Sequence, residues 1–324
     1  MAEILITGAA GFVGNNLARH LLNSGHEVNL LLREDYAQWR IKGISDHVRI
    51  CALDLCDSER LNQVVRRVRP EWIFHLAAHG QYSYQTDAEK ILQTNLIGTA
   101  NLVRACLGVG FEVFVNTGSS SEYGLKDHAP AETEFLEPNS FYAVTKASAT
   151  LFCSYTARIS GLRIPTLRLY SVYGPYEEPS RLMPTLILHG LENKLPPLVD
   201  PDIARDFIYV DDVVQAYVLA ATLRDQEVDA VYNVGTGVQT TLRHVVEITH
   251  QVLNITNEPV WGSMPNRTWD TSTWVANSNR IREALGWKPM YSFEQGFSRM
   301  VEWFRSGPEV IKTYKNIANH CIPE

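Results

Sequence analysis

Short hydrophobic runs alternate with longer amphipathic segments through the first half of the chain. Short, fully apolar runs are typical of strands that are buried on both faces, and the segments between them are long enough to be crossover helices. The pattern predicts an α/β fold with a doubly wound parallel sheet. The predicted strands are Glu3–Thr7, Glu27–Leu32, Val48–Leu53, Trp72–Leu76, Glu112–Thr117 and Ile164–Tyr170, and the predicted helices lie near Phe12–Asn23, Ser58–Val68, Ala88–Val109 and Phe141–Ser160.

The alternation changes after residue 172. Prolines at 175, 179, 184, 196, 197 and 201 interrupt it, which indicates a second, smaller lobe. The run "RDFIYVDDVVQAY" followed by "VYNVGTG" then returns to a strand, helix and strand pattern. We expect a first domain over residues 1–172 with a return at about 206–237, and a C-terminal lobe over 173–205 and 238–324.

Composition narrows the class of protein. The net charge is -7 and the 29 Lys and Arg are scattered, so we expect no nucleic-acid partner. The five cysteines form no C-x-x-C pair, so we expect no metal site and no disulfide framework. No stretch reaches the roughly 18 apolar residues of a membrane span. We therefore expect a cytoplasmic protein with no membrane partner.

A glycine motif follows the first predicted strand. The sequence "ILITGAAGFVG" places Gly8, Gly11 and Gly14 after that strand and at the start of an amphipathic helix. Such glycines permit a tight turn and a close backbone approach, while the helix N-terminus holds a pyrophosphate. Three glycines alone would mark only a tight turn, but this context predicts a dinucleotide site that includes Phe12 and Val13.

Arg33 lies where many NAD-binding proteins carry an acidic residue that binds the ribose 2′-hydroxyl. The second predicted strand ends on Leu32, and Arg33 follows it. A guanidinium pairs with a 2′-phosphate by charge-assisted hydrogen bonds, and Arg40 could join it. We favour NADP(H) as the cofactor. NAD(H) is the alternative if Arg33 is only a solvated strand end that pairs with Glu34 or Asp35.

The sequence "ALDLCD" ends the third predicted strand. Asp54 could accept a hydrogen bond from the adenine amino group in the crevice beyond that strand, with Leu55 next to it. Asp57 is the better cap for the following helix. This leaves Asp54 free, and we assign Asp54 and Leu55 to the cofactor site.

A tyrosine and a lysine lie four residues apart on a predicted helix. Tyr142 and Lys146 share one helix face, and an ammonium near a phenol lowers the phenol's pKa. Such a tyrosine can exchange a proton with a sugar hydroxyl or carbonyl. The fifth strand ends in "SSS", Ser119 to Ser121, whose hydroxyls could bond the same oxygen; the simpler interpretation is a serine-rich turn.

Taken in order, these motifs resemble those of an extended short-chain dehydrogenase/reductase, in the nucleotide-sugar epimerase, dehydratase and reductase group. The resemblance spans residues 7 to 289 and implies a Rossmann-type fold with a nucleotide-sugar-binding lobe. The matching segments are "TGAAGFVG", "DLCD", "HLAA", "TNLIGT", "SSSEYG", "YAVTK", "LRLYSVYGP", "ARDFIYVDDV", "YNVGTG", "NRTWD" and "LGWKP".

The resemblance also implies roles for single residues. Ser119, Tyr142 and Lys146 would form the catalytic triad, with Tyr142 and Lys146 also touching the cofactor and Ala77 lying next to it. The substrate would be a nucleotide-diphosphate sugar, and the family habit is a homodimer built from the helices near 88–109 and 141–160. The substrate-binding residues would be His79, Ser120, Ser171, Arg205 and Arg267, the two arginines neutralising the diphosphate.

Simpler interpretations of the arginines and tryptophans remain open. Arg205 could form a salt bridge with Asp206 or Asp211, and Arg267 could pair with Asp270. For Trp261, Trp269 and Trp274, packing in the core is the default and stacking on a base is the alternative.

The resemblance narrows the reaction. The family's 4,6-dehydratases carry acidic residues just after the catalytic hydroxyl, where this chain has Ser120 and Ser121. Glu122 comes one position later and in an extended chain would point to the opposite side. This pattern disfavours a dehydratase.

Arg33 favours NADPH and therefore a reductase, and Ser171 replaces the asparagine of many epimerases. Our first hypothesis is NADPH-dependent reduction of a nucleotide-linked 4-keto-6-deoxyhexose at C4. The alternative is an NAD-dependent nucleotide-sugar 4-epimerase with the same triad. A third hypothesis, a non-catalytic NADP-binding sensor, is opposed by the intact triad.

Overall fold

The computed structural model describes residues 1–82, 84–224, 227–266 and 271–320. Within these ranges one sheet contains seven parallel strands in the order β10-β6-β5-β4-β1-β2-β3. The Rossmann-type doubly wound sheet predicted from the sequence is confirmed. The strands are β1 (Glu3–Thr7), β2 (Glu27–Leu32), β3 (Arg49–Ala52), β4 (Trp72–His75), β5 (Val113–Ser119), β6 (Thr166–Leu169) and β10 (Val231–Val234).

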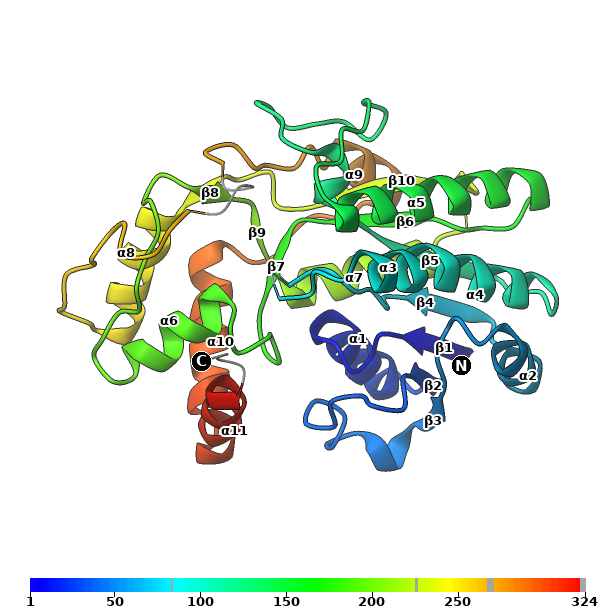
Figure 1. Cartoon of the computed structure of the whole chain (residues 1–324), viewed down its shortest axis with the longest axis horizontal. Coiled ribbons are helices and arrows are strands. Elements are labelled where there is room, and N and C mark those ends of the chain that lie inside the picture. The colour runs from blue at the N-terminus through cyan, green and yellow to red at the C-terminus, as the bar shows by residue number, and fades with distance from the viewer. Residues whose placement is uncertain (83, 225–226, 267–270, 321–324) are drawn as a thin grey trace.

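Helices cover both faces of this sheet (Figure 1). On one face α1 (Phe12–Asn23) and α7 (Val210–Thr222) bury their apolar side chains. The other face is covered by α2 (Ser58–Val68), α4 (Gly98–Leu107) and α5 (Phe141–Ser160). Burial on both faces explains why the strands are short and almost wholly apolar.

The helix predicted near 88–109 is divided in the structure. It consists of α3 (Ala88–Leu92), a π-helical turn over Gln93–Ile97, and α4. π-Helical turns inside helices often occur at functional sites. The turn carries Asn95, whose side chain is buried.

A smaller lobe lies to one side of the sheet (Figure 1). It has its own apolar core, built largely from four helices: α6 (Leu182–Gly190), α8 (Leu242–Leu253), α10 (Phe293–Arg305) and α11 (Pro308–His320). The chain enters this region after β6 and returns to the sheet with β10, which pairs in parallel with β6. The exact domain limits stay a prediction.

The remaining elements are short. They are β7 (Ser171–Tyr173), β8 (Ala204–Arg205), β9 (Phe207–Tyr209), β11 (Thr240–Thr241), α9 (Asn279–Leu285) and 3-10 turns at Ser45–His47 and Ser120–Tyr123.

The strand order creates one favourable place for a ligand. The chain runs β1, β2, β3 to one side and then crosses to β4 on the other side of β1. In open α/β sheets, ligands bind beyond the carboxyl ends of the strands where the order reverses. Thr7 pairs with His75, and His75 with Asn116, so the ends of β1, β4 and β5 meet at the same edge.

No helix among the described residues is both long and apolar enough to cross a lipid bilayer.

A buried aspartate ties the lobe to the sheet. Asp206, with no exposed surface, lies between β8 and β9. Its carboxylate accepts hydrogen bonds from the backbone N–H groups of Thr236 at 2.8 Å, Gly237 at 2.9 Å and Ala276 at 3.0 Å. It therefore holds the turn after β10 against the segment that precedes α9.

Replacing this carboxylate should destabilise the fold. Asp206→Ala leaves the buried N–H of Ala276 without an acceptor and removes the hydrogen bonds from Thr236 and Gly237, which we expect to lower the free energy of unfolding by about 2–4 kcal/mol. Urea denaturation measures the change. Asp202→Ala, at a side chain that is 76% exposed, is the matched control and should cost little. Equal stability of the two variants would contradict the role given to Asp206.

Candidate functional site

The glycine turn between β1 and α1 has the form of a cradle. Gly8 has a φ of +72°, and a Cβ on it would lie 2.6 Å from the backbone N of Ala77. A Cβ on Gly14 would lie 2.5 Å from the Gly8 carbonyl oxygen. Gly11 is the N-cap of α1 and offers no side-chain cap to its first N–H groups. The turn therefore fits a pyrophosphate held by backbone N–H groups, as a dinucleotide requires.

The other predicted cofactor residues lie around the same edge of the sheet. Ala77 follows β4, and its N–H donates to the Thr7 hydroxyl at 3.1 Å. Leu55 is buried just after β3. Phe12 and Val13, the first residues of α1, are half-buried. The structure thus brings the glycine turn together with the ends of β3 and β4.

Asp57 caps α2, as the sequence predicts, by accepting a hydrogen bond from the Arg60 N–H at 3.0 Å. The Asp54 carboxylate accepts a bond from the Cys56 N–H at 2.8 Å and so also stabilises its own turn. A contact between Asp54 and an adenine stays a prediction.

The two arginines considered for a 2′-phosphate behave differently. Arg33 forms an ion pair with Asp35 at 2.9 Å, and both side chains are exposed. This geometry agrees with the salt-bridge interpretation of Arg33. Arg40 does not join it, because its buried guanidinium is paired with Glu178 at 2.9 Å.

The turn after β5 is organised by a buried carboxylate. Glu122 has no exposed surface and forms an ion pair with Arg168 at 2.9 Å. Its other oxygen accepts hydrogen bonds from the Ser119 N–H at 2.8 Å and from the Thr150 hydroxyl at 3.1 Å. The Ser119 hydroxyl lies 2.5 Å from that of Ser121. Glu122 thus points into the protein, away from the hydroxyls at the edge.

Tyr142 and Lys146 lie on α5, next to this turn. Burial raises the pKa of Tyr142 to about 12, while a hydrogen bond with Ser119 and the charge of Arg181 act to lower it. The net shift is upward, because desolvation outweighs the groups that lower this pKa, and an effect of Lys146 on Tyr142 stays a prediction. Lys146 is itself buried, and burial lowers its pKa. Ser119 and Tyr142 are nevertheless brought together as expected.

The sequence-based reasoning missed Arg181 and Tyr82, and it gave no role to Asn95 in the matching segment "TNLIGT". Arg181 is the N-cap of α6, and its charge reaches Tyr142. Tyr82, in the loop after β4, is close enough to act on the same phenol. Asn95 links two parts of the site: its amide donates to the His79 carbonyl at 2.8 Å and to the Thr145 hydroxyl at 3.0 Å. The place of Arg181 just before the apolar run "LMPTLIL" was the available signal.

Two predicted substrate residues lie near the turn after β5. His79 follows β4, and its N–H donates to the Asn95 side chain at 2.7 Å. Ser120 is buried and lines a narrow pocket together with Tyr170, Lys126 and Trp274.

The remaining substrate residues come from the lobe side. Ser171 begins β7 and donates its N–H to the Asp206 carbonyl at 3.0 Å. Arg205, on β8, donates to the Ala204 carbonyl at 2.7 Å and lies 5.5 Å above the Trp274 ring. Arg267 and Trp269 lie outside the described residues. Trp261 packs against the lobe core, as expected by default.

Within the described part of the chain no group of three or more His, Cys, Asp or Glu side chains could hold a metal ion.

The chain is similar to known epimerases and dehydratases along most of its length. Residues 4–235 match the model of the NAD dependent epimerase/dehydratase family. A UDP-glucose 4-epimerase of Mycolicibacterium smegmatis is 30% identical over 316 residues, which covers 93% of this chain and 98% of that protein. A dTDP-glucose 4,6-dehydratase of Neisseria meningitidis is 28% identical over 333 residues, covering 94% and 93%. The solved UDP-glucose 4-epimerase of Thermus thermophilus, a complex with NAD, superposes with a TM-score of 0.83 at 28% identity, and the match covers 94% of this chain and 99% of that one.

The charge of Arg181 should contribute to the pKa of Tyr142. Arg181→Met removes a charge that lowers the pKa of Tyr142, so this pKa rises and less tyrosinate is present at a given pH. Activity that needs tyrosinate falls as pH drops through the pKa, so the limb of the pH–rate profile moves to higher pH. We expect roughly a two- to tenfold lower rate at neutral pH.

The control is Arg181→Lys, which keeps the positive charge and should keep most of the profile. Identical pH–rate profiles for Arg181→Met and the unmodified protein would contradict the electrostatic role of Arg181.

Proposed function

This chain belongs to the NAD dependent epimerase/dehydratase family, and we propose that within it the chain is a nucleotide-sugar 4-epimerase that uses NAD(H). The observation that carries the proposal is its similarity to a UDP-glucose 4-epimerase along 93% of its length. This favours the second hypothesis drawn from the sequence over the first. UDP-hexoses are accordingly the first substrates to consider.

The choice of NAD(H) over NADP(H) rests on the surroundings of Arg33. A 2′-phosphate would have to compete with the Asp35 carboxylate, which already pairs with this guanidinium. The second arginine that might have strengthened a phosphate site, Arg40, is buried in another ion pair. The Thermus thermophilus epimerase is likewise a complex with NAD.

The position of Glu122 supports an epimerase over a dehydratase. Elimination of water needs an acid and a base that reach the sugar. Glu122 is committed to Arg168, Thr150 and the backbone of Ser119, and the positions between Ser119 and Glu122 carry only hydroxyls. A buried carboxylate held in this way is a structural group.

The chain's own residues would perform the following steps. The glycine cradle at Gly8, Gly11 and Gly14 would hold the cofactor. The nicotinamide, when bound, would supply the hydride-transfer chemistry at the sugar C4. Tyr142 would take the proton of the C4 hydroxyl and give it back to the same oxygen, and Ser119 would hold that oxygen by a hydrogen bond.

The remaining groups would bind and orient. Lys146 lies one helical turn after Tyr142 and would support the nicotinamide ribose. Arg205, with Trp274 below it, offers positive charge to the substrate diphosphate from the lobe side. An epimerase must return the hydride to the sugar it came from, so no net cofactor is consumed.

A cofactor-free interconversion assay tests this function. We expect purified protein, with no added cofactor, to convert UDP-glucose to UDP-galactose until equilibrium, measured by ion-exchange chromatography. Tyr142→Phe should reduce the rate by about 100-fold or more, since it removes the acid–base group. No interconversion of UDP-, dTDP-, GDP- or CDP-hexoses, together with stoichiometric NADPH oxidation by a 4-keto-6-deoxyhexose nucleotide, would contradict the proposal and return the reductase hypothesis.

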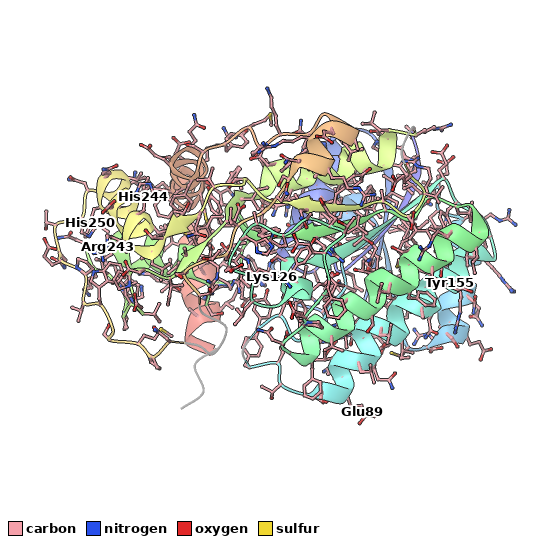
Figure 2. The ribbon with its side chains drawn as sticks, turned by 90° about the horizontal axis from the view of Figure 1, so that it is seen from above. Glu89, Lys126, Tyr155, Arg243, His244 and His250 are labelled. Carbon is pink, nitrogen blue, oxygen red and sulfur yellow. The ribbon has the colours of Figure 1, made fainter. Side chains whose placement is uncertain are left out.

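A homodimer remains part of the proposal. Large apolar side chains lie exposed at helical spacing on α5, namely Val144, Leu151, Tyr155 and Ile159. Leu92 and Ile97, on the segment preceding α4, are also exposed. Figure 2 shows α5 running alongside the α3–α4 segment, with Tyr155 on its outer side. A continuous apolar surface over two helices supports pairing with a second copy.

A charge on this surface should separate the dimer. We expect Leu151→Asp to convert the protein mostly to monomer, because pairing would bury the carboxylate without a partner. Sedimentation velocity measures the change. Leu125→Asp, at an apolar residue that is 50% exposed outside the stripe, is the control. Monomeric unmodified protein would contradict the proposed dimer.

A further inference from the structure

Arg40 lies where three segments of the chain meet. The guanidinium Nε donates to the Tyr176 carbonyl at 2.8 Å, and one terminal nitrogen contacts the Glu178 carboxylate at 2.9 Å. The other terminal nitrogen donates to the Ala10 carbonyl, inside the glycine turn, at 3.3 Å. The residue is only 4% exposed. One side chain therefore joins the cradle of the candidate cofactor site to the turn that follows β7.

The backbone of Arg40 is fixed as firmly as its side chain. Its carbonyl accepts hydrogen bonds at 2.9 Å from the side-chain amide of Asn15 and from the guanidinium of Arg19. Both donors lie on α1. The Arg40 guanidinium also stacks on Trp39 at 4.0 Å from the ring centroid. Arg40 is thus anchored to the helix that begins at the glycine turn.

The turn that Arg40 holds is strained. Tyr176 has a φ of +68°, a left-handed conformation that a residue with a bulky side chain rarely adopts. Such a conformation persists where the surroundings determine it more than once. Here the Tyr176 ring packs against Arg19 at 4.5 Å and Trp303 at 4.9 Å, while Arg40 binds its carbonyl.

This turn leads directly to Arg181. The Arg181 N–H donates to the Glu178 carbonyl at 2.9 Å, and its side chain lies 3.7 Å from the Glu177 carboxylate. Glu178 is the partner of Arg40, so the position of Arg181 depends on that ion pair. The charge of Arg181 in turn reaches Tyr142.

We propose that Arg40 is a positioning residue that holds the glycine turn of the candidate cofactor site against residues 174–181, the segment that ends at Arg181. The pair with Glu178 is buried, with side chains 5% and 13% exposed, so removal of either partner leaves an uncompensated charge. Lysine cannot replace Arg40, because a single ammonium lacks the planar fork that reaches three acceptors at once.

Three variants and one control test whether Arg40 holds the glycine turn against residues 174–181. Arg40→Lys keeps the charge, Arg40→Met with Glu178→Gln removes both charges, and Glu178→Gln alone keeps the shape of the partner. Arg224→Met, which breaks an exposed ion pair with Glu112, is the control. Thermal unfolding first shows whether each variant is folded. The double variant leaves no uncompensated buried charge, so it can be tested even if a single variant does not fold.

The first readout needs no activity. We expect amide hydrogen exchange to increase together in residues 8–14 and 174–181 of the Arg40 variants, and to stay unchanged in Arg224→Met. If amide exchange stays unchanged in either segment of the Arg40 variants, Arg40 does not hold the two segments together, whether or not the protein is an epimerase.

The second readout rests on the proposed function. In Arg40→Lys the dissociation constant for NAD should rise about tenfold or more, the scale of a lost charge-assisted hydrogen bond. The pH–rate limb should move to higher pH, as expected for Arg181→Met, because displacement of residues 174–181 weakens the electrostatic effect of Arg181 on Tyr142.

Different results would contradict the proposed epimerase function and the positioning role of Arg40. Unmodified protein that neither binds NAD nor interconverts any hexose nucleotide contradicts the proposed function, and the exchange data then decide whether Arg40 holds the two segments together. Unmodified protein that is active, with Arg40 variants that keep its NAD affinity and pH profile, overturns the positioning role alone.

Discussion

Glu122 is the group on which the arrangement of the candidate active site depends. Its carboxylate, buried without exposed surface, holds the backbone of Ser119, the hydroxyl of Thr150 on α5 and the guanidinium of Arg168 on β6. A charge in such a place is tolerated only when it is paired and hydrogen-bonded. Through this one group the end of β5, the helix that carries Tyr142 and the neighbouring strand keep a fixed geometry.

This constraint also limits the chemistry. Because Glu122 is buried, the turn after β5 would offer hydroxyls to a substrate, while Tyr142 is the group proposed to exchange a proton. Burial raises the pKa of Tyr142 to about 12, and the Ser119 hydrogen bond and nearby positive charge act against this rise. Arg181 provides part of that charge from the lobe side. In the proposed epimerase the lobe would therefore contribute to proton exchange as well as to substrate binding.

The strands, the glycine turn and the order of the motifs were predictable, because local periodicity and turn chemistry determine them. The division of the helix near 88–109 was not, since a π-helical turn leaves the pattern of apolar residues almost unchanged. Arg40 and Glu178 are 138 residues apart in the sequence, and only tertiary packing brings them together. Arg33 illustrates the opposite error: its partner, Asp35, was already visible two residues away.

The fate of the hydrogen at the sugar C4 tests the central claim most directly. Purified protein would be incubated with UDP-glucose deuterated at C4, in the presence of excess unlabelled NADH and NADPH, and the UDP-galactose analysed by mass spectrometry. A 4-epimerase that returns hydride to the same sugar predicts that deuterium stays at C4 of the product. Deuterium that appears in the free cofactor pool or in solvent, or the absence of any product, would contradict the account.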